Sequence, residues 1–378
     1  MLHFAPEEYA ARRGRLRAEM AARGLDAMLL FAPESQYWAT GYDTFGYCFF
    51  QCLVIDHEGE ALLTRSADLR QARLTSTVED VRIWKDAAGA DPTADLADLL
   101  AARGLAGKRL GIETDTHGLT ARWGAAMAAR FPGLVEASEI APRLRLTQSP
   151  AEIAMTRRAA EIGDACYLKA LPLIRPGADE AAILAAMQGE VFAMGGDYAG
   201  NEFIIGSGEG ALLCRYFAGR RRLDERDQLT LEWAGVWRHY HAALMRTVIV
   251  GDPRPEHRSM HGAAEEALLA CEAALRPGRA MGEVFAAHAA ALDRAGFGAA
   301  RLNACGYALA ARFSPSWMEP FMFYENAETE MAPGMVFFLH MILMDSRTGA
   351  AMTLGRTSLV TETGAEPLSA LPLDLPLR

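Results

Sequence analysis

One acidic residue stands in the middle of an otherwise apolar segment. Glu232 lies within residues 229–235, whose other side chains are mostly apolar, so the segment predicts a buried strand. An unpaired charge in such a place costs on the order of several kcal/mol. A carboxylate there is therefore paired, neutralised or used in chemistry, and we expect Glu232 to be catalytic.

Two histidines add groups that can carry a proton. His340 is the single polar residue of the apolar run 336–344, and His241 closely follows Glu232. The pKa of an imidazole lies near working pH, which suits proton transfer. A hydrogen-bonded core histidine is the alternative interpretation of His340. Because these polar residues share one half of the chain, we expect a catalytic site that contains Glu232, His340 and His241.

The segments around these residues indicate two domains. Ser149 followed by Pro150 is typical of a helix start, with Ser149 as the expected N-cap of a long amphipathic helix. We therefore expect domains over residues 1–147 and 148–378. The first alternates strands and helices, which favours an α/β layer domain. The second combines helices with a largely antiparallel sheet and is expected to be α+β.

The second domain contains an internal repeat. A long helix is predicted to end at Arg-Pro-Gly in residues 173–177 and again in residues 275–278, and a second helix follows in both places. A duplicated helix–turn–helix followed by strands indicates two related halves. The repeat therefore predicts a pseudo-twofold domain with its site between the halves.

Composition limits the possible classes of function. The chain has 378 residues, of which 51% are hydrophobic and 23% charged, as is typical of a folded globular protein. Its net charge of -10 argues against nucleic acid as a partner. The longest apolar run, residues 335–344, is too short to cross a bilayer as a helix, so we expect no membrane partner.

The sequence shows no motif for a cofactor or a metal ion. The HExxH, P-loop and zinc-finger spacings are missing, and the glycine-rich residues 206–211 are interpreted as a tight turn. Six cysteines without a CxxC pair indicate reduced thiols, and the first residues lack the apolar segment of a signal peptide. We expect a cytoplasmic protein that binds a small-molecule substrate and needs no cofactor.

Aromatic residues are unusually dense early in the chain. Residues 37–50 contain seven of them, which is more than core packing requires. We expect Tyr42, Asp43 and Tyr47 to lie on a loop that reaches a ligand pocket. Core packing is the alternative interpretation of this segment.

Four segments of the second domain resemble the superfamily of methionine aminopeptidases, prolidases and creatinase. They are residues 147–153, 240–247, 333–337 and 359–364. Segments of the first domain resemble the N-terminal domain of the prolidase and creatinase branches. These are residues 8–9, 15–16, 24–27 and 37–42. The resemblance implies an α/β N-terminal domain followed by an α+β pita-bread domain with an internal pseudo-twofold repeat.

The metal ligands of this superfamily do not carry over to this chain. Its peptidases hold two metal ions with two Asp, one His and two Glu. The matching places here are occupied by Glu232, Ala243, Tyr307, His340 and Gly355. Two hard cations need several anionic oxygens, so the resemblance implies a site without metal. A single ion held by Glu232, His340 and His241 is the alternative.

The same resemblance implies that the site has gained positive charge in exchange. Arg215 stands where the family pattern has a histidine, and Arg356 follows the last missing carboxylate. Guanidinium forks suit carboxylates, so we expect both residues to bind a substrate carboxylate. Pairing with Glu232 is the alternative. Phe217, Trp233 and Trp317 are the aromatic residues expected to line the pocket.

Among the metal-free branches, the chain is similar to ectoine hydrolases and creatinase. It shares Glu-x-Ala-Gly at residues 232–235 and the stretch 315–317 with the ectoine hydrolases. The resemblance implies a metal-independent hydrolase that opens an ectoine-like cyclic amidine at a C–N bond. A creatinase-type amidinohydrolase or a prolidase-related peptidase is the alternative, and a non-catalytic small-molecule-binding protein is a second one.

The same resemblance implies a role for each candidate residue. Glu232 is expected to pair with the amidinium or to activate water, and His340 or His241 to protonate the departing nitrogen. Tyr307 is expected to donate a hydrogen bond to the tetrahedral intermediate. In creatinase-like dimers, the N-terminal domain of one subunit helps to close the site of the other. We therefore expect a homodimer in which the aromatic loop described above serves that purpose.

Overall fold

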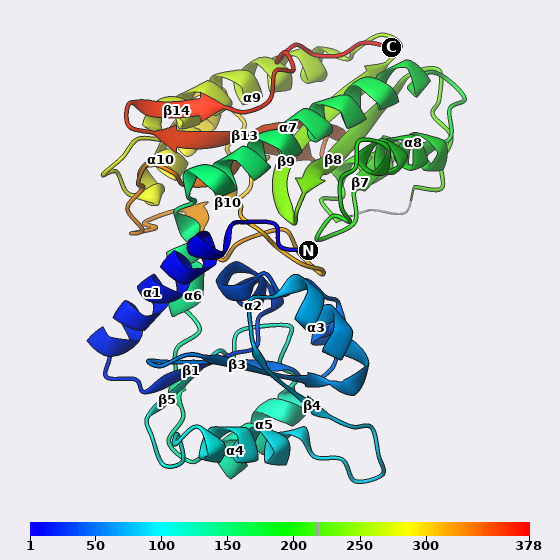
Figure 1. The fold of residues 1–378 in the computed structure, drawn as a ribbon. Helices are drawn as coiled ribbons and strands as arrows, with labels where there is room; N and C mark the ends of the chain where they lie inside the picture. Colours follow the sequence, from blue (N-terminus) through cyan, green and yellow to red (C-terminus); the bar gives the residue numbers. More distant parts are fainter. Residues whose placement is uncertain (216–218) are drawn as a thin grey trace. The chain divides into compact units, whose positions relative to one another are not determined.

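The structure, a computed structural model, describes residues 1–215 and 219–378. These residues form two compact units, Met1–Arg145 and Leu146–Arg378 (Figure 1). The division falls two residues before the boundary that the sequence predicts between residues 147 and 148. Each unit has its own sheet and its own core, and each is described by itself.

The N-terminal unit is a six-stranded mixed sheet with helices on both faces, which confirms the predicted α/β class. In spatial order, its strands are β4 (Asp80–Trp84), β3 (Glu60–Arg65), β2 (Cys52–Asp56), β1 (Ala27–Leu30), β5 (Leu110–Ile112) and β6 (Val135–Glu136). Its helices are α1 (Pro6–Ala22), α2 (Pro33–Thr40), η1 (Gly46–Cys48), η2 (Ser66–Asp68), α3 (Leu69–Thr75), α4 (Pro92–Ala102), α5 (Ala121–Arg130) and α6 (Ile140–Leu146). One apolar cluster joins the sheet to α4 and α5, and a second joins it to α1, α2, α3 and α6.

The C-terminal unit is an antiparallel sheet with long helices packed on it, as the sequence predicts. In spatial order, its strands are β11 (Met322–Tyr324), β10 (Ala304–Ala308), β12 (Val336–Asp345), β13 (Ala350–Thr361), β9 (Tyr240–Val250), β8 (Asp227–Trp237) and β7 (Ile204–Ser207), with β14 (Gly364–Pro367) paired to β13. Its helices are α7 (Pro150–Ala170), η3 (Leu171–Leu173), α8 (Glu180–Ala193), η4 (Gly208–Leu212), α9 (Pro255–Ala274) and α10 (Met281–Arg294). α7 packs against β8 and β9, and α9 packs against β12 and β13 (Figure 1).

Local signals of the sequence explain where the first long helix of this unit starts. The Ser149 side chain accepts a hydrogen bond from the Glu152 backbone N–H at 3.3 Å, and the Glu152 carboxylate accepts one from the Ser149 N–H at 2.9 Å. This reciprocal capping box satisfies two backbone donors that the first turn of a helix leaves free. The predicted start of α7 is therefore confirmed.

The internal repeat has the same turn geometry in both copies. Gly177 and Gly278 both have φ of 76°, in the left-handed region that glycine enters without strain. The Gly177 N–H donates to the Leu223 carbonyl and the Gly278 N–H to the Met331 carbonyl, each at 2.8 Å. The two Arg-Pro-Gly segments thus connect their helices by equivalent turns, which fits two related halves.

The sheet of the C-terminal unit has two faces with different surroundings, because strand side chains alternate. On one face, the Trp233 indole N–H of β8 donates to the Gly163 carbonyl of α7 at 2.7 Å, and Arg356 of β13 pairs with Glu272 of α9. We call this the helix face. The neighbouring position Glu232 points the opposite way, to what we call the site face.

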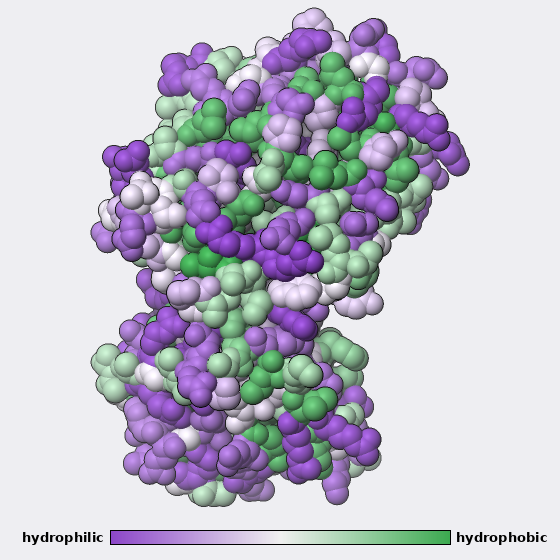
Figure 2. Space-filling view, turned by 45° about the horizontal axis from the view of Figure 1, so that its top comes forward, coloured by the Kyte–Doolittle hydropathy of each residue, from purple (hydrophilic) through white to green (hydrophobic). Residues whose placement is uncertain are grey.

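Apolar side chains gather in the interior clusters of each unit. On the side of the molecule shown in Figure 2, hydrophilic side chains cover much of both units, with hydrophobic ones between them. None of the helices that the structure describes combines the length and hydrophobicity needed to cross a membrane.

Candidate active site

Glu232 lies on the site face, near the middle of β8. The register of the sheet places Ile204 of β7 and Met245 of β9 beside it. Only 7% of Glu232 is exposed, and these two neighbours carry no charge. The sequence prediction of a carboxylate buried in an apolar strand is therefore confirmed, while its catalytic role stays a prediction.

Tyr307 and His340 reach the same place from the other half of the repeat. Tyr307 of β10 lies opposite Phe338 of β12, and His340 follows two positions later on the same face. The Tyr307 hydroxyl donates to Glu232 Oε1 at 3.3 Å, and its ring centroid lies 5.7 Å from that of His340. The structure thus brings together three residues that are far apart in the sequence.

Trp317 adds a second hydrogen bond to this cluster. Its indole Nε1 donates to the Tyr307 hydroxyl oxygen at 2.8 Å. Trp317 is buried in the segment between β10 and β11. The residue was expected to line the pocket, and the structure gives it a specific polar contact inside the cluster.

Burial is the main influence on the protonation of this cluster. It raises the pKa of Glu232 to about 7, against the lowering effects of the Arg215 charge and the Tyr307 hydrogen bond. Burial and the neighbouring carboxylate raise the pKa of the Tyr307 hydroxyl far above its ordinary value, so Tyr307 remains a donor. Glu232 therefore exchanges its proton near neutral pH, as a general base requires.

Arg215 supplies positive charge next to the cluster. It lies on an exposed turn that follows η4. Its charge lowers the pKa of Glu232 and contributes to lowering that of His340, which places it near both groups. Phe217, the third aromatic residue expected in the pocket, falls outside the residues that the structure describes.

His340 is a neutral imidazole at physiological pH. Burial lowers its pKa to about 3, with smaller contributions from the charges of His288 and Arg215. Its ring packs beside those of Tyr307 and Phe338, with centroids 5.7 and 5.4 Å away. The sequence prediction assumes an ordinary imidazole pKa, and burial removes the positively charged form that makes histidine a strong proton donor.

His241 supports a loop of the site. Its Nε2 accepts a hydrogen bond from the Gly200 N–H at 2.9 Å, and burial lowers its pKa to about 3. A ring nitrogen that accepts from a backbone N–H carries no proton of its own. A Cβ added at Gly200 would lie only 2.8 Å from the backbone nitrogen of Trp317, so this loop packs tightly against Trp317. Nε2 of His241 therefore cannot give a proton, because it holds the loop that packs against Trp317. The expected proton-donor role stays a prediction and would fall to Nδ1.

Two residues expected to contact the substrate lie on the helix face instead. Both Arg356 nitrogens bind the Glu272 carboxylate, at 2.8 and 2.7 Å. The Trp233 ring stacks on Tyr167 with centroids 5.3 Å apart. Arg356 follows Gly355 in the sequence, and Trp233 follows Glu232. Because side chains alternate along a strand, Arg356 and Trp233 point to the face opposite to these two site-face positions. The substrate contacts expected of Arg356 and Trp233 are therefore corrected to packing roles.

The aromatic loop of the N-terminal unit divides between core and surface. Tyr42 is buried, its hydroxyl lies 3.1 Å from Thr64 Oγ1, and burial raises its pKa to about 12. Tyr42 is therefore a core residue, contrary to its expected place in a ligand pocket. Asp43 and Tyr47 are half-buried, and their expected contribution to a site stays a prediction.

The residues at the expected metal-ligand positions do not form a site for two cations. Ala243 and Gly355 have no side-chain donor atom, and a Cβ at Gly355 would lie 2.7 Å from the Leu339 carbonyl oxygen and 2.9 Å from the Phe338 ring. Among the residues that the structure describes, no group of three or more His, Cys, Asp and Glu is placed to hold a metal ion. Because two hard cations need several anionic oxygens, this donor set does not fit them.

Phe338 is a residue of the site that the sequence analysis missed. Its ring occupies the space into which a ligand side chain at position 355 would have to extend. Phe338 lies two positions before His340 in a strand, and residues two apart share a face. That alternation is the signal by which it could have been found.

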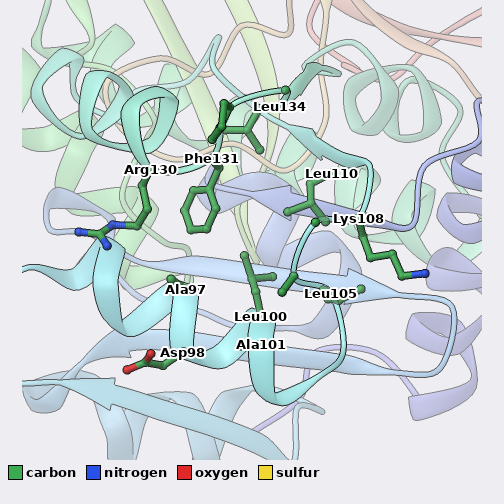
Figure 3. A pocket seen from close by; sticks show the side chains of 14 residues that line it. Ala97, Asp98, Leu100, Ala101, Leu105, Lys108, Leu110, Arg130, Phe131 and Leu134 are labelled. Carbon is green, nitrogen blue, oxygen red and sulfur yellow. The ribbon is translucent and has the colours of Figure 1, made fainter.

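A separate cavity of about 450 Å³ lies in the N-terminal unit, beside α4 and the end of α5. Figure 3 shows Leu100 and Phe131 pointing into it, whereas the Lys108 and Arg130 side chains extend away at its edges. Arg130 pairs with Asp91. The lining is mostly apolar, so this cavity offers no chemistry comparable with that of the Glu232 cluster.

The family of the chain follows from its two domains. Residues 154–362 match the model of metallopeptidase family M24, and residues 12–147 match that of the creatinase/prolidase N-terminal domain. The first match covers more than half of the chain, which therefore belongs to family M24. The predicted superfamily and the two-domain pita-bread fold are confirmed.

Individual relatives agree with this assignment. The chain is 29% identical to the ectoine hydrolase of Halomonas elongata over 99% of its own length and 98% of that protein. Its fold matches an Xaa-Pro dipeptidase from Bacillus anthracis with a TM-score of 0.85 at 20% identity, covering 98% and 100% of the two chains. It also matches dipeptidase PepE from Mycobacterium ulcerans with a TM-score of 0.86 at 22% identity, covering 99% of both. The chain is thus a hydrolase of this family, acting on C–N bonds.

Proposed function

We propose that this protein hydrolyses the C–N bond of an ectoine-like cyclic amidine carboxylate without a metal ion. The single observation that carries the proposal is the replacement of a dimetal ligand set by one buried carboxylate, Glu232, with Tyr307 bound to it and the Arg215 charge nearby. The similarity to an ectoine hydrolase over nearly the whole of both chains supports the substrate class.

The charges of the cluster complement such a substrate. An amidinium is a planar cation and pairs with an ionised Glu232, while a guanidinium such as Arg215 binds a carboxylate in a fork. Arg215 is exposed on its turn, so it can meet a substrate as it enters. The buried carboxylate and the exposed cation together favour a small zwitterion over a neutral peptide bond.

One carboxylate with a pKa near 7 can serve both proton transfers. Water attacks the amidine carbon, a C–O bond forms, and Glu232 takes the proton that the water releases. The C=N bond becomes single and its electron pair moves to nitrogen. Glu232 then returns the proton to the ring nitrogen that leaves, and the C–N bond breaks as the hydroxyl oxygen forms the C=O bond. The hydroxyl proton passes to the released amine, so an open-chain amide with an ammonium group remains.

The fold neighbours support a second candidate. Several are named as dipeptidases or prolidases, so a prolidase-related peptidase remains the alternative, as does a creatinase-type amidinohydrolase. A binding protein without turnover is a further alternative. The expected homodimer and cytoplasmic location are also proposals, and sedimentation of the purified protein tests the first of them.

A substrate panel separates these candidates. Purified protein is incubated with ectoine, hydroxyectoine, creatine and an Xaa-Pro dipeptide, and the products are followed by mass spectrometry. Ring opening of ectoine or hydroxyectoine supports the proposal. Cleavage of the dipeptide or of creatine alone contradicts it, and calorimetric binding of ectoine without any product indicates the binding protein.

A further inference from the structure

The indole of Trp317 determines which way the Tyr307 hydroxyl can point. An indole N–H is only a donor, so at 2.8 Å the Tyr307 oxygen must accept from it. The hydroxyl proton of Tyr307 must then be directed elsewhere. Glu232 Oε1, at 3.3 Å, is an acceptor in that position.

We propose that Trp317 is a positioning residue, which holds the hydroxyl proton of Tyr307 on Glu232 and so makes Tyr307 a partner of the base instead of a donor to the substrate. The proposal rests on the proposed function in one respect, because Glu232 is the reacting carboxylate there. The hydrogen-bond geometry itself does not depend on which substrate binds.

The surroundings of Trp317 fix its backbone independently of any ligand. The Trp317 N–H donates to Asn201 Oδ1 at 3.2 Å. Gly200 packs so closely on residues 316–317 that even a Cβ would overlap with them, and its own N–H is held by His241 Nε2. His241, which has no proton to give at Nε2, thus acts through this loop on the position of the indole.

The expected consequence is a stronger hydrogen bond to the carboxylate. When a hydroxyl oxygen accepts one hydrogen bond, it becomes a better donor in the next. Removing the indole N–H therefore weakens the Tyr307 bond to Glu232 and disfavours the ionised carboxylate.

Few groups near Glu232 can compete with this effect. Among the residues that the structure describes, the titratable or charged groups of this cluster are Tyr307 of β10, Arg215 and Cys214 of the turn after η4, and His340 of β12. The adjacent positions on β7, β9 and β13 are uncharged, being Ile204, Met245 and Gly355. Burial makes His340 neutral, so Arg215 and Tyr307 are the groups that favour the carboxylate.

The chain offers a matched control for Trp317. Trp233 is also fully buried and also donates its indole N–H, to the Gly163 carbonyl at 2.7 Å. It lies on the helix face, one residue from Glu232 in sequence. Trp233→Phe therefore removes the same atoms and a similar volume without touching the Tyr307 hydroxyl.

The test is an infrared titration of Glu232 that needs no substrate. The C=O band of the protonated acid is assigned by its loss in Glu232→Gln, and its midpoint is measured in the full chain. We expect a midpoint of about 7 for the unaltered protein and a rise of about 1 pH unit in Trp317→Phe and in Tyr307→Phe. The double variant should match Tyr307→Phe alone, and Trp233→Phe should match the unaltered protein.

Two results overturn the proposal. One is a Glu232 midpoint that stays unchanged in Trp317→Phe although Tyr307→Phe raises it. The other is a rise of the midpoint in Trp233→Phe that equals the rise in Trp317→Phe. If Trp317→Phe does not fold, the indole N–H is replaced by sulfur with a benzothienylalanine at position 317, which keeps the shape of the side chain and is judged by the same midpoint. Failure of the proposed function is distinguishable, because it appears as missing turnover of ectoine with the titration as expected.

Discussion

On the helix face of the C-terminal sheet, the Arg356 guanidinium is held by both oxygens of Glu272, and Ser358 adds a hydrogen bond to the same carboxylate. On the site face, Glu232 receives one hydrogen bond from the residues that the structure describes, of 3.3 Å from Tyr307, and burial raises its pKa to about 7. Both carboxylates are buried against the same sheet, Glu272 on α9 and Glu232 on β8. The difference teaches that a carboxylate with a matched partner stabilises the fold, whereas one with an incomplete set of partners is available for chemistry.

The contrast is sharpest for the two carboxylates themselves. We expect Glu232→Gln to lower turnover of ectoine by about 100-fold or more, because it removes the general base. Thermal unfolding should change by no more than about 1–2 kcal/mol, since Glu232 forms no ion pair with the residues that the structure describes. Full activity in this variant would show that Glu232 is structural.

The matched variant on the helix face should behave in the opposite way. Glu272→Gln leaves the largely buried Arg356 beside an amide, and we expect a loss of about 3 kcal/mol in the free energy of unfolding. Urea denaturation measures this loss, and ectoine turnover in the native range should stay close to that of the unaltered protein. A stable but inactive Glu272→Gln would contradict the distinction between the two faces.

The raised pKa of Glu232 predicts a pH dependence of both activity and stability. The base must be ionised, so kcat/KM should fall about tenfold per pH unit below pH 7. For stability, a carboxyl whose pKa is higher in the folded than in the unfolded state contributes fully below about 4.5, and the contribution is lost as pH rises to about 7. The difference in unfolding free energy between the unaltered protein and Glu232→Gln isolates this contribution, and a difference that does not change over that range would refute it.

A smaller effect, on stability alone, is expected at Gly355, the position where Phe338 fills the space of a metal ligand. A Cβ at Gly355 meets the Leu339 carbonyl oxygen and the Phe338 ring, so Gly355→Ala should cost about 1–3 kcal/mol of stability. Gly189 in α8 is the control, because a Cβ there meets nothing within 4 Å and Gly189→Ala should stabilise the protein by about 0.5–1 kcal/mol. Equal effects of the two changes in thermal unfolding would mean that Phe338 does not fill the site.

Features encoded by neighbouring residues could be predicted from the sequence. Ser149 and Glu152 form their capping box within one turn, and the two Arg-Pro-Gly turns need only their own glycines. Glu232 and His340 were recognisable because each is a polar residue in an apolar strand. In all these cases, the signal and its cause lie within a few residues of each other.

Features that depend on strand pairing could not be predicted in the same way. Arg356 and Trp233 sit one position from site-face residues, and only the orientation of the strands sends them to α9 and α7. The low pKa of His241 arises mainly from its burial, and its hydrogen-bond partner Gly200 is distant in the sequence. These properties come from the register and burial of the assembled sheet.

We propose that Glu232 acts in a site from which the metal ligands have been lost. The most direct test of this proposal is the turnover of ectoine by protein treated with a chelator and shown by elemental analysis to hold no transition metal. We expect the same rate before and after this treatment. Activity that disappears with the metal and returns with Mn²⁺ or Co²⁺ would contradict it.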